Sequence, residues 1–142
     1  MSHIARSFQV SLLINHPSID PDDITSAIGL APYRTMRAGD QRSTPRGDPL
    51  DGIYECSRWM HRFDVKGASD LGVVLEDLVT QLQKHEPFFH RLVKEDGRVV
   101  LFCGVFVAGN WDELLPHSLL GQLASLHVDL RLDVYPKGEA SA

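Results

Sequence analysis

RVVLFCGVFVA (residues 98–108) is apolar at odd and even positions alike. A strand with one face in solvent alternates apolar and polar residues, whereas a strand covered on both faces reads as a continuous apolar run. This stretch therefore predicts the central strand of a sheet. Each face of that sheet then needs a cover: helices on one side and, on the other, residues 87–92, the long loop of residues 31–52 or a second copy of the chain.

Three more segments have the character of strands. Residues 7–15 and 128–135 alternate apolar with polar side chains, which is the pattern of a half-buried strand whose apolar positions all face the core. Residues 53–65 alternate imperfectly, and a bulge near Ser57 would bring the aromatic residues on both sides of it onto one face. The sequence thus predicts four strands.

Helices are expected between these strands. The first, residues 20–29, has local start and stop signals: Asp20 as N-cap, Pro21 in the first turn and Gly29 as C-cap. Leucine spacing predicts the longest helix over residues 69–86, with Ser69 as its cap. Two shorter proline-started helices are expected over residues 87–96 and 116–127.

Together these elements predict one α+β domain over residues 1–142, with residues 136–142 as a flexible tail. We expect a four-stranded, mainly antiparallel sheet with helices packed on one face. The strand-helix-strand order recurs before and after the long central helix, so the predicted plan is ferredoxin-like, with a pseudo-repeat of a split unit.

Composition narrows the class of protein. The chain has 142 residues, 43% of them hydrophobic and 23% charged, and a formal net charge of -5, so a folded domain is expected and general nucleic-acid binding is not. No apolar run is long enough to span a bilayer and no secretory signal is recognisable, which predicts a cytoplasmic protein without a membrane partner. Cys56 and Cys103 are expected to be free thiols.

Several short motifs occur in a recognisable order along the chain. They are the acidic helix start at residues 20–23, Gly29 with Leu30 and Pro32, Arg37 before Gly39 and Asp40, Trp59, and Asp133 with Tyr135. In this order they resemble the bacterial family named domain of unknown function 4279, over nearly the whole chain. The resemblance implies a compact α+β domain of a bacterial cytosolic protein and supplies no catalytic residues.

An arginine-rich loop is the first candidate site. Guanidinium groups bind carboxylates and phosphates through paired donors, and glycines let backbone N–H groups approach an anion. The alternative is a solvated connector whose arginines pair with nearby aspartates. The candidate ligands of an anion are Arg34, Arg37, Arg42 and Arg46 in the loop, with Arg58 and Arg62 on the following strand.

Trp59 and His61 form the second candidate site, because they are two residues apart and share one face of a strand. An indole and an imidazole beside Arg37 could form a small pocket with a titratable group. The alternative, that Trp59 and Phe63 are core residues and His61 is a semi-buried histidine with satisfied hydrogen bonds, is favoured because aromatic residues at strand spacing usually pack. The histidines and cysteines have no metal-site spacing, and no nucleotide loop or nucleophile elbow occurs, so no metal or cofactor is expected.

The sequence favours a non-enzymatic binding or interaction module that holds an anionic ligand or an acidic partner through the arginine loop, and that forms a homodimer. One alternative is an enzyme of unknown reaction centred on His61 and Trp59. Another is a small immunity-like protein that neutralises a toxin; no residue selects it.

Overall fold

The computed structural model describes residues 6–136 of the chain. The predicted tail begins at the last residue of the final strand, and its remainder, residues 137–142, lies outside the described residues. In chain order the elements are β1 (Arg6–His16), α1 (Pro21–Ile28), β2 (Arg34–Met36), β3 (Gln41–Ser43), β4 (Pro49–Ile53), β5 (Ser57–Arg62), α2 (Leu71–Leu82), η1 (Gln83–His85), α3 (Glu86–Lys94), β6 (Arg98–Val107), α4 (His117–Ser125) and β7 (Val128–Pro136).

The main sheet has five strands in the order β2-β5-β1-β6-β7, and β3 pairs with β4 in a separate two-stranded sheet. β1 is antiparallel to β5 and β6, β2 is antiparallel to β5, and β7 is parallel to β6. The α+β class is confirmed. The predicted four-stranded, mainly antiparallel, ferredoxin-like sheet is wrong, because a fifth strand forms inside the expected loop and the last strand pairs parallel.

The two strand-helix-strand halves also close differently. From β1 the chain passes through α1, β2 and the β3–β4 hairpin before it reaches β5, the antiparallel neighbour of β1. From β6 it passes through α4 alone and reaches β7, a parallel neighbour. A split β-α-β unit keeps another strand between its two parallel strands. Neither half has that arrangement, so the predicted pseudo-repeat is wrong.

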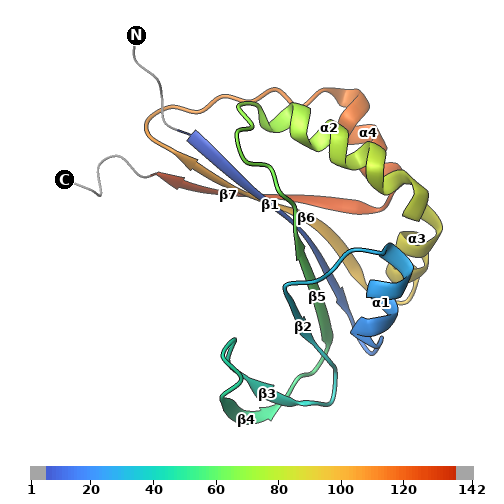
Figure 1. The fold of residues 1–142 in the computed structure, drawn as a ribbon. Helices are drawn as coiled ribbons and strands as arrows, with labels where there is room; N and C mark the ends of the chain where they lie inside the picture. The colour runs from blue at the N-terminus through green and yellow to red at the C-terminus, as the bar shows by residue number, and fades with distance from the viewer. Residues whose placement is uncertain (1–5, 137–142) are drawn as a thin grey trace.

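The helices α1–α4 all lie on one side of the main sheet (Figure 1). On this face β6 buries a complete row of side chains, as its apolar sequence predicts: Val99, Leu101, Cys103, Val105 and Val107. The segment of residues 87–92 belongs to the same side, since Phe89 and Leu92 of α3 are buried in the same core. It therefore does not cover the opposite face of the sheet.

That opposite face carries the other side chains of β6. Val100, Phe102 and Phe106 are half-buried there, beside Leu13 of β1 and Met60 of β5, with which they share a face by register. The long loop does not lie flat over them. It adds β2 to the edge of the sheet and then projects as the β3–β4 hairpin (Figure 1). We call this surface, opposite the helices, the open face.

The predicted single strand over residues 53–65 is two strands. β4 ends at Ile53 and β5 begins at Ser57, so a break stands where a bulge was expected. A similar correction applies to β7, where Leu132 is 42% and Val134 is 44% exposed although both were expected to face the core. β7 is an edge strand, and the helices do not cover its outer half.

Helix ends follow local chemistry. Asp20 caps α1 by accepting a hydrogen bond from the N–H of Asp22 at 2.9 Å, and Gly29 closes it with φ 78°, as predicted. The cap of α2 is Asp70 rather than Ser69, since the Asp70 carboxylate accepts from the N–H groups of Gly72 and Val73. A carboxylate at this position also offsets the positive end of the helix dipole.

Candidate functional site: an arginine-lined hollow

The β3–β4 hairpin gives the expected loop a defined shape. At its tip the N–H of Thr44 donates to the carbonyl of Asp48 at 2.8 Å, and the N–H of Asp48 donates to the Thr44 hydroxyl at 3.1 Å. Gly47 has φ 93°, a conformation that costs a side-chain-bearing residue energy and glycine little. The arginine-rich segment is therefore an ordered arm.

Ser43 connects this arm to the main sheet. Its N–H donates to the Tyr54 hydroxyl at 2.9 Å, and its carbonyl accepts from that hydroxyl at 3.0 Å and from Arg34 Nη2 at 3.1 Å. The Ser43 side chain first, then its backbone N–H, and then Arg34 lower the pKa of the Tyr54 phenol. Arg34 of β2 is thus held across the base of the hairpin.

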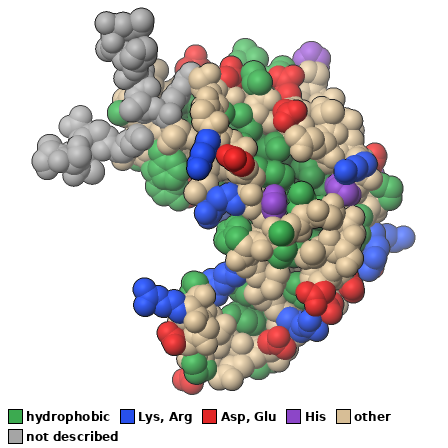
Figure 2. All heavy atoms as spheres, viewed as in Figure 1, with side chains coloured by type: hydrophobic (Ala, Val, Ile, Leu, Met, Phe, Trp, Pro, Cys, Tyr) green, Lys and Arg blue, Asp and Glu red, His purple; other side chains and the backbone are tan. Residues whose placement is uncertain are grey.

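A hollow of about 710 Å³ lies between the hairpin, β2 and the start of β5. Arg34, Arg42 and Arg58 border it, one from each of β2, β3 and β5. Met36 pairs in register with Arg58, so the hollow opens onto the open face of the sheet. Figure 2 shows a wide concavity on the left of the molecule with Lys and Arg side chains along its edges. The hollow is lined only by residues between positions 34 and 58.

The charge around the hollow differs from that of the whole chain. Three arginines border it against two acids, Asp51 and Glu55, which leaves one net positive charge in a protein of net charge -5. Arg42 donates to the carbonyl of Asp51 at 3.2 Å, and Arg58 forms no ion pair with any residue from 6 to 136. Because a guanidinium group binds a carboxylate or phosphate by donating two parallel hydrogen bonds, the three arginines can bind an anionic group in the hollow.

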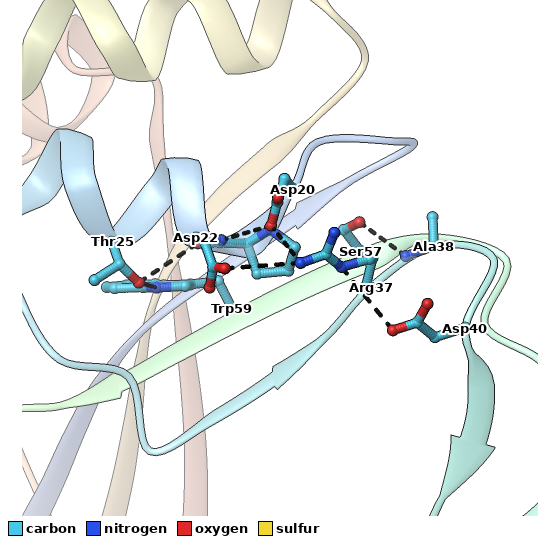
Figure 3. A network of polar contacts seen from close by, with 9 residues as sticks. Asp20, Asp22, Thr25, Arg37, Ala38, Asp40, Ser57 and Trp59 are labelled. Carbon is cyan, nitrogen blue, oxygen red and sulfur yellow. Dashed lines mark hydrogen bonds and ion pairs between the residues drawn. The ribbon is translucent and has the colours of Figure 1, made fainter.

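Arg37, by contrast, lies outside the hollow. Its guanidinium is 2.9 Å from Asp20, 3.7 Å from Asp22 and 3.9 Å from Asp40, and Figure 3 shows it pointing toward the start of α1. Nearby, the N–H of Ala38 donates to the Ser57 hydroxyl at 3.0 Å. These contacts tie the end of β2 to α1 and β5, so Arg37 has a structural role. Arg46 is exposed near the tip of the hairpin and does not border the hollow.

The two residues of the second candidate site, Trp59 and His61, lie together on the helix side of β5. Trp59 is fully buried on the helix side, where its indole N–H donates to the Thr25 hydroxyl at 3.0 Å. His61 shares that side, stacks on Trp59 and meets Phe63 edge to face, and its Nδ1 is 2.6 Å from the carbonyl of Ala31. Arg62 points to the open face, with its guanidinium 4.7 Å from the centre of the Tyr33 ring. The structure therefore does not bring His61 and the arginines together.

Outside the hollow, the carboxyl group of Glu113 lies beside that of Asp70 and has a raised pKa. Glu113 accepts hydrogen bonds from the N–H groups of Leu71 and Gly72, at 3.2 Å each, beside the capping carboxylate of Asp70. Burial first, and then the hydrogen bond with Asp70, raise the pKa of Glu113. Since both carboxyl groups stabilise the first turn of α2, capping explains this pair.

The described residues also bear on metals, membranes and thiols. Within residues 6–136 no cluster of three or more His, Cys, Asp or Glu side chains could hold a metal ion, and no helix is long and apolar enough to cross a membrane. Both cysteines are free, as predicted. Burial raises the pKa of the Cys103 thiol to about 12, so this thiol stays protonated at neutral pH.

The sequence indicated all three arginines that border the hollow and missed Ser43 and Tyr54, which position the hairpin. A signal for them was present. The turn residues Thr-Pro-Arg-Gly-Asp-Pro at 44–49 lie between two short segments, residues 41–43 and 50–53, which is typical of a hairpin with a longer loop. The two strands of the hairpin were missed because they have no hydrophobic periodicity: neither β3 nor β4 contributes a buried side chain to the core.

A family model described as "Domain of unknown function (DUF4279)" matches residues 6–137 of the chain. The chain belongs to this family. The resemblance indicated by the motifs from Asp20 to Tyr135 is thereby confirmed, and the match extends over the whole sheet and the hairpin of this DUF4279 domain. Searches of curated proteins and of solved structures gave no match to the chain.

Proposed function

We propose that this DUF4279 protein is a binding module of the bacterial cytoplasm whose hollow holds an anionic ligand or an acidic segment of a partner protein. The observation that carries the proposal is the convergence of Arg34, Arg42 and Arg58 on one concavity from three separate strands. A volume of about 710 Å³ is in the range of sites for small molecules or short peptide segments.

The three arginines have different duties in this proposal. Arg34 donates one hydrogen bond to the carbonyl of Ser43, and Arg42 donates one to the carbonyl of Asp51, both on the hairpin. A guanidinium has five N–H donors, so both retain donors for a ligand. Arg58 makes no ion pair within residues 6–136 and contributes its charge to the hollow. It is the best position at which to remove binding without disturbing the fold.

Apolar side chains complete the proposed site. Met36, Leu50 and Ile53 border the same hollow, and Leu50 and Ile53 of β4 are exposed. A ligand that combines a carboxylate or phosphate with an apolar part matches this lining better than a free inorganic ion, since burial of apolar surface adds to affinity. Neither the enzyme alternative nor toxin neutralisation gains a specific observation, and both stay predictions of the sequence.

The test is a thermal-shift and calorimetric titration with three defined probes: inorganic phosphate, citrate and a hexaglutamate peptide. We expect citrate or hexaglutamate to raise the melting temperature of the wild-type protein, and the shift to fall as sodium chloride is added. Arg58→Ala should remove the shift while leaving the melting temperature of the unliganded protein unchanged.

Arg46→Ala is the matched control, because Arg46 belongs to the same hairpin and does not border the hollow. It should retain the ligand-induced shift. The proposal is overturned if none of the three probes shifts the melting temperature of the wild type. It is also overturned if Arg58→Ala keeps the full ligand-induced shift, as the control Arg46→Ala should.

A further inference from the structure

The two edges of the main sheet differ in length. One edge is β2, which has three residues and continues into the hairpin; the other is β7, which has nine. β7 pairs with β6 on one side and with no other strand of residues 6–136, so within this part of the chain its other side presents unpaired backbone N–H and C=O groups. A long unprotected edge strand is a template on which another strand can add by main-chain hydrogen bonding.

The side chains of β7 suit such a partner. Leu132 and Val134 on the helix side and Tyr135 on the open face are each between 42% and 44% exposed. On α4, which packs beside β7, Leu120 is also exposed. The edge thus combines free hydrogen-bonding groups with an apolar surface, and it has no proline before its last residue, Pro136, to block pairing.

The sequence of β7 is complementary to itself when two copies run antiparallel. The strand extends from residue 128 to residue 136, so its midpoint is Leu132. With Leu132 opposite Leu132 of a second copy, Arg131 lies opposite Asp133 in both directions, and Leu130 lies opposite Val134. Opposite charges and apolar pairs directly across two strands stabilise a sheet, whereas like charges destabilise it.

Neighbouring registers are worse. Moving the centre to residue 131 places Asp129 opposite Asp133 and Arg131 opposite itself, and moving it to residue 133 places two Asp133 side chains together. A centre at residue 130 keeps an Asp129–Arg131 pair but shortens the overlap and leaves Val134 and Tyr135 without partners. Only the central register pairs all nine residues of the strand.

We infer that the protein forms a two-fold symmetric homodimer through antiparallel pairing of β7 with β7 of a second copy, centred on Leu132. The product is a continuous ten-stranded sheet. The two-fold axis then runs perpendicular to the sheet, so both open faces and both arginine-lined hollows lie on the same side. Seven inter-strand steps separate the two β5 strands, which is roughly 34 Å at about 4.8 Å per step.

Charge reversal tests the interface and its register. By sedimentation equilibrium, wild type should have twice the monomer mass of 15.8 kDa. Arg131→Asp alone places acids opposite acids, and Asp133→Arg alone places arginines opposite arginines, so each should weaken the dimer roughly tenfold. The double variant with both changes restores opposite charges and should recover the wild-type dissociation constant. A monomeric wild type, or a double variant no tighter than the single ones, overturns the inference.

A cysteine pair measures the register independently of affinity. In a Cys56→Ser, Cys103→Ala background, which also removes the thiol that β6 places beside residue 132, Leu132→Cys places two thiols of the dimer directly opposite each other, within the Cα separation that a disulfide spans. Val134→Cys is the matched control with nearly equal exposure, since its two thiols would be four positions apart, roughly 13 Å. Mild oxidation should cross-link the first variant and leave the second unlinked. Equal cross-linking of both, or of neither, contradicts the register.

Discussion

Arg58 and Trp59 are adjacent in β5 and lie in opposite environments. Trp59 is completely buried beneath the helices, whereas Arg58 is exposed at the hollow on the open face. Successive side chains of a strand point to opposite faces, so one six-residue strand serves both the core and the candidate site. The comparison teaches that stability and binding in this protein can be altered separately at neighbouring residues.

The largest expected effect is on the helix side. Trp59→Ala removes a fully buried indole and its hydrogen bond to Thr25, so it should lower the free energy of unfolding by about 3–5 kcal/mol. Urea denaturation measures this change. A loss of less than about 1 kcal/mol would show that the site collapses around the cavity and that the helix side is not closely packed.

The next effect depends on pH and involves His16, which is 6% exposed. Its Nδ1 accepts from the N–H groups of Ser18 and Ile19, so Nε2 carries the proton and donates to Glu95 at 2.9 Å. The hydrogen bond from His16 first, with a further contribution from Arg91, lowers the pKa of Glu95 below 4.5. A carboxyl group with a lowered folded-state pKa stabilises the fold above its unfolded pKa and loses that contribution as the pH falls through the folded value.

Glu95→Gln should therefore be less stable than wild type at pH 7, and the difference should shrink as the pH is lowered below 4.5. The measurement is urea denaturation of both proteins at several pH values. Asp77→Asn is a suitable control on α2, because Asp77 is exposed and bonded only to the side chain of Gln81 among the described residues. A difference that stays constant with pH would contradict the role of the Glu95 charge.

A smaller effect is expected at Arg37, which lies in the same loop as the arginines of the hollow but pairs with aspartates. Its side chain is 46% exposed, so Arg37→Ala should cost only about 0.5–1 kcal/mol of unfolding free energy. Binding of citrate or hexaglutamate should be unchanged, because Arg37 does not border the hollow. If Arg37→Ala lost binding while its stability stayed unchanged, the binding site would have to include Arg37, on the side of the loop away from the hollow.

The smallest effect on stability is expected at Arg58. Arg58→Ala removes no ion pair within residues 6–136 and should change the free energy of unfolding by no more than about 0.5 kcal/mol. The two adjacent substitutions should therefore affect different measurements: Trp59→Ala lowers stability in urea denaturation, and Arg58→Ala removes binding in ligand titration. A large loss of stability in Arg58→Ala would show that the open face, too, is part of the core.

Local chemistry alone determined several features of this protein. Asp20, Pro21 and Gly29 set both ends of α1, because a cap needs only residues within one turn of it. The apolar residues at odd and even positions of 98–107 indicated an interior strand, and β6 does pair with a strand on each side; it is not the central strand, and its second face is only half-buried. The sequence identified the arginines as candidates, but it could not separate those that border the hollow from those that do not.

Tertiary structure decided the rest. β2 has three residues and no periodicity of its own, and it becomes a strand only because β5 offers a free edge for its backbone. The direction of β7 is likewise a property of its pairing with β6, since the same alternating sequence fits a parallel or an antiparallel neighbour. Arg34 and Arg37 are three residues apart, yet their roles differ because they contact different distant elements. Arg34 donates to the carbonyl of Ser43 on the hairpin, whereas Arg37 pairs with Asp20 at the start of α1.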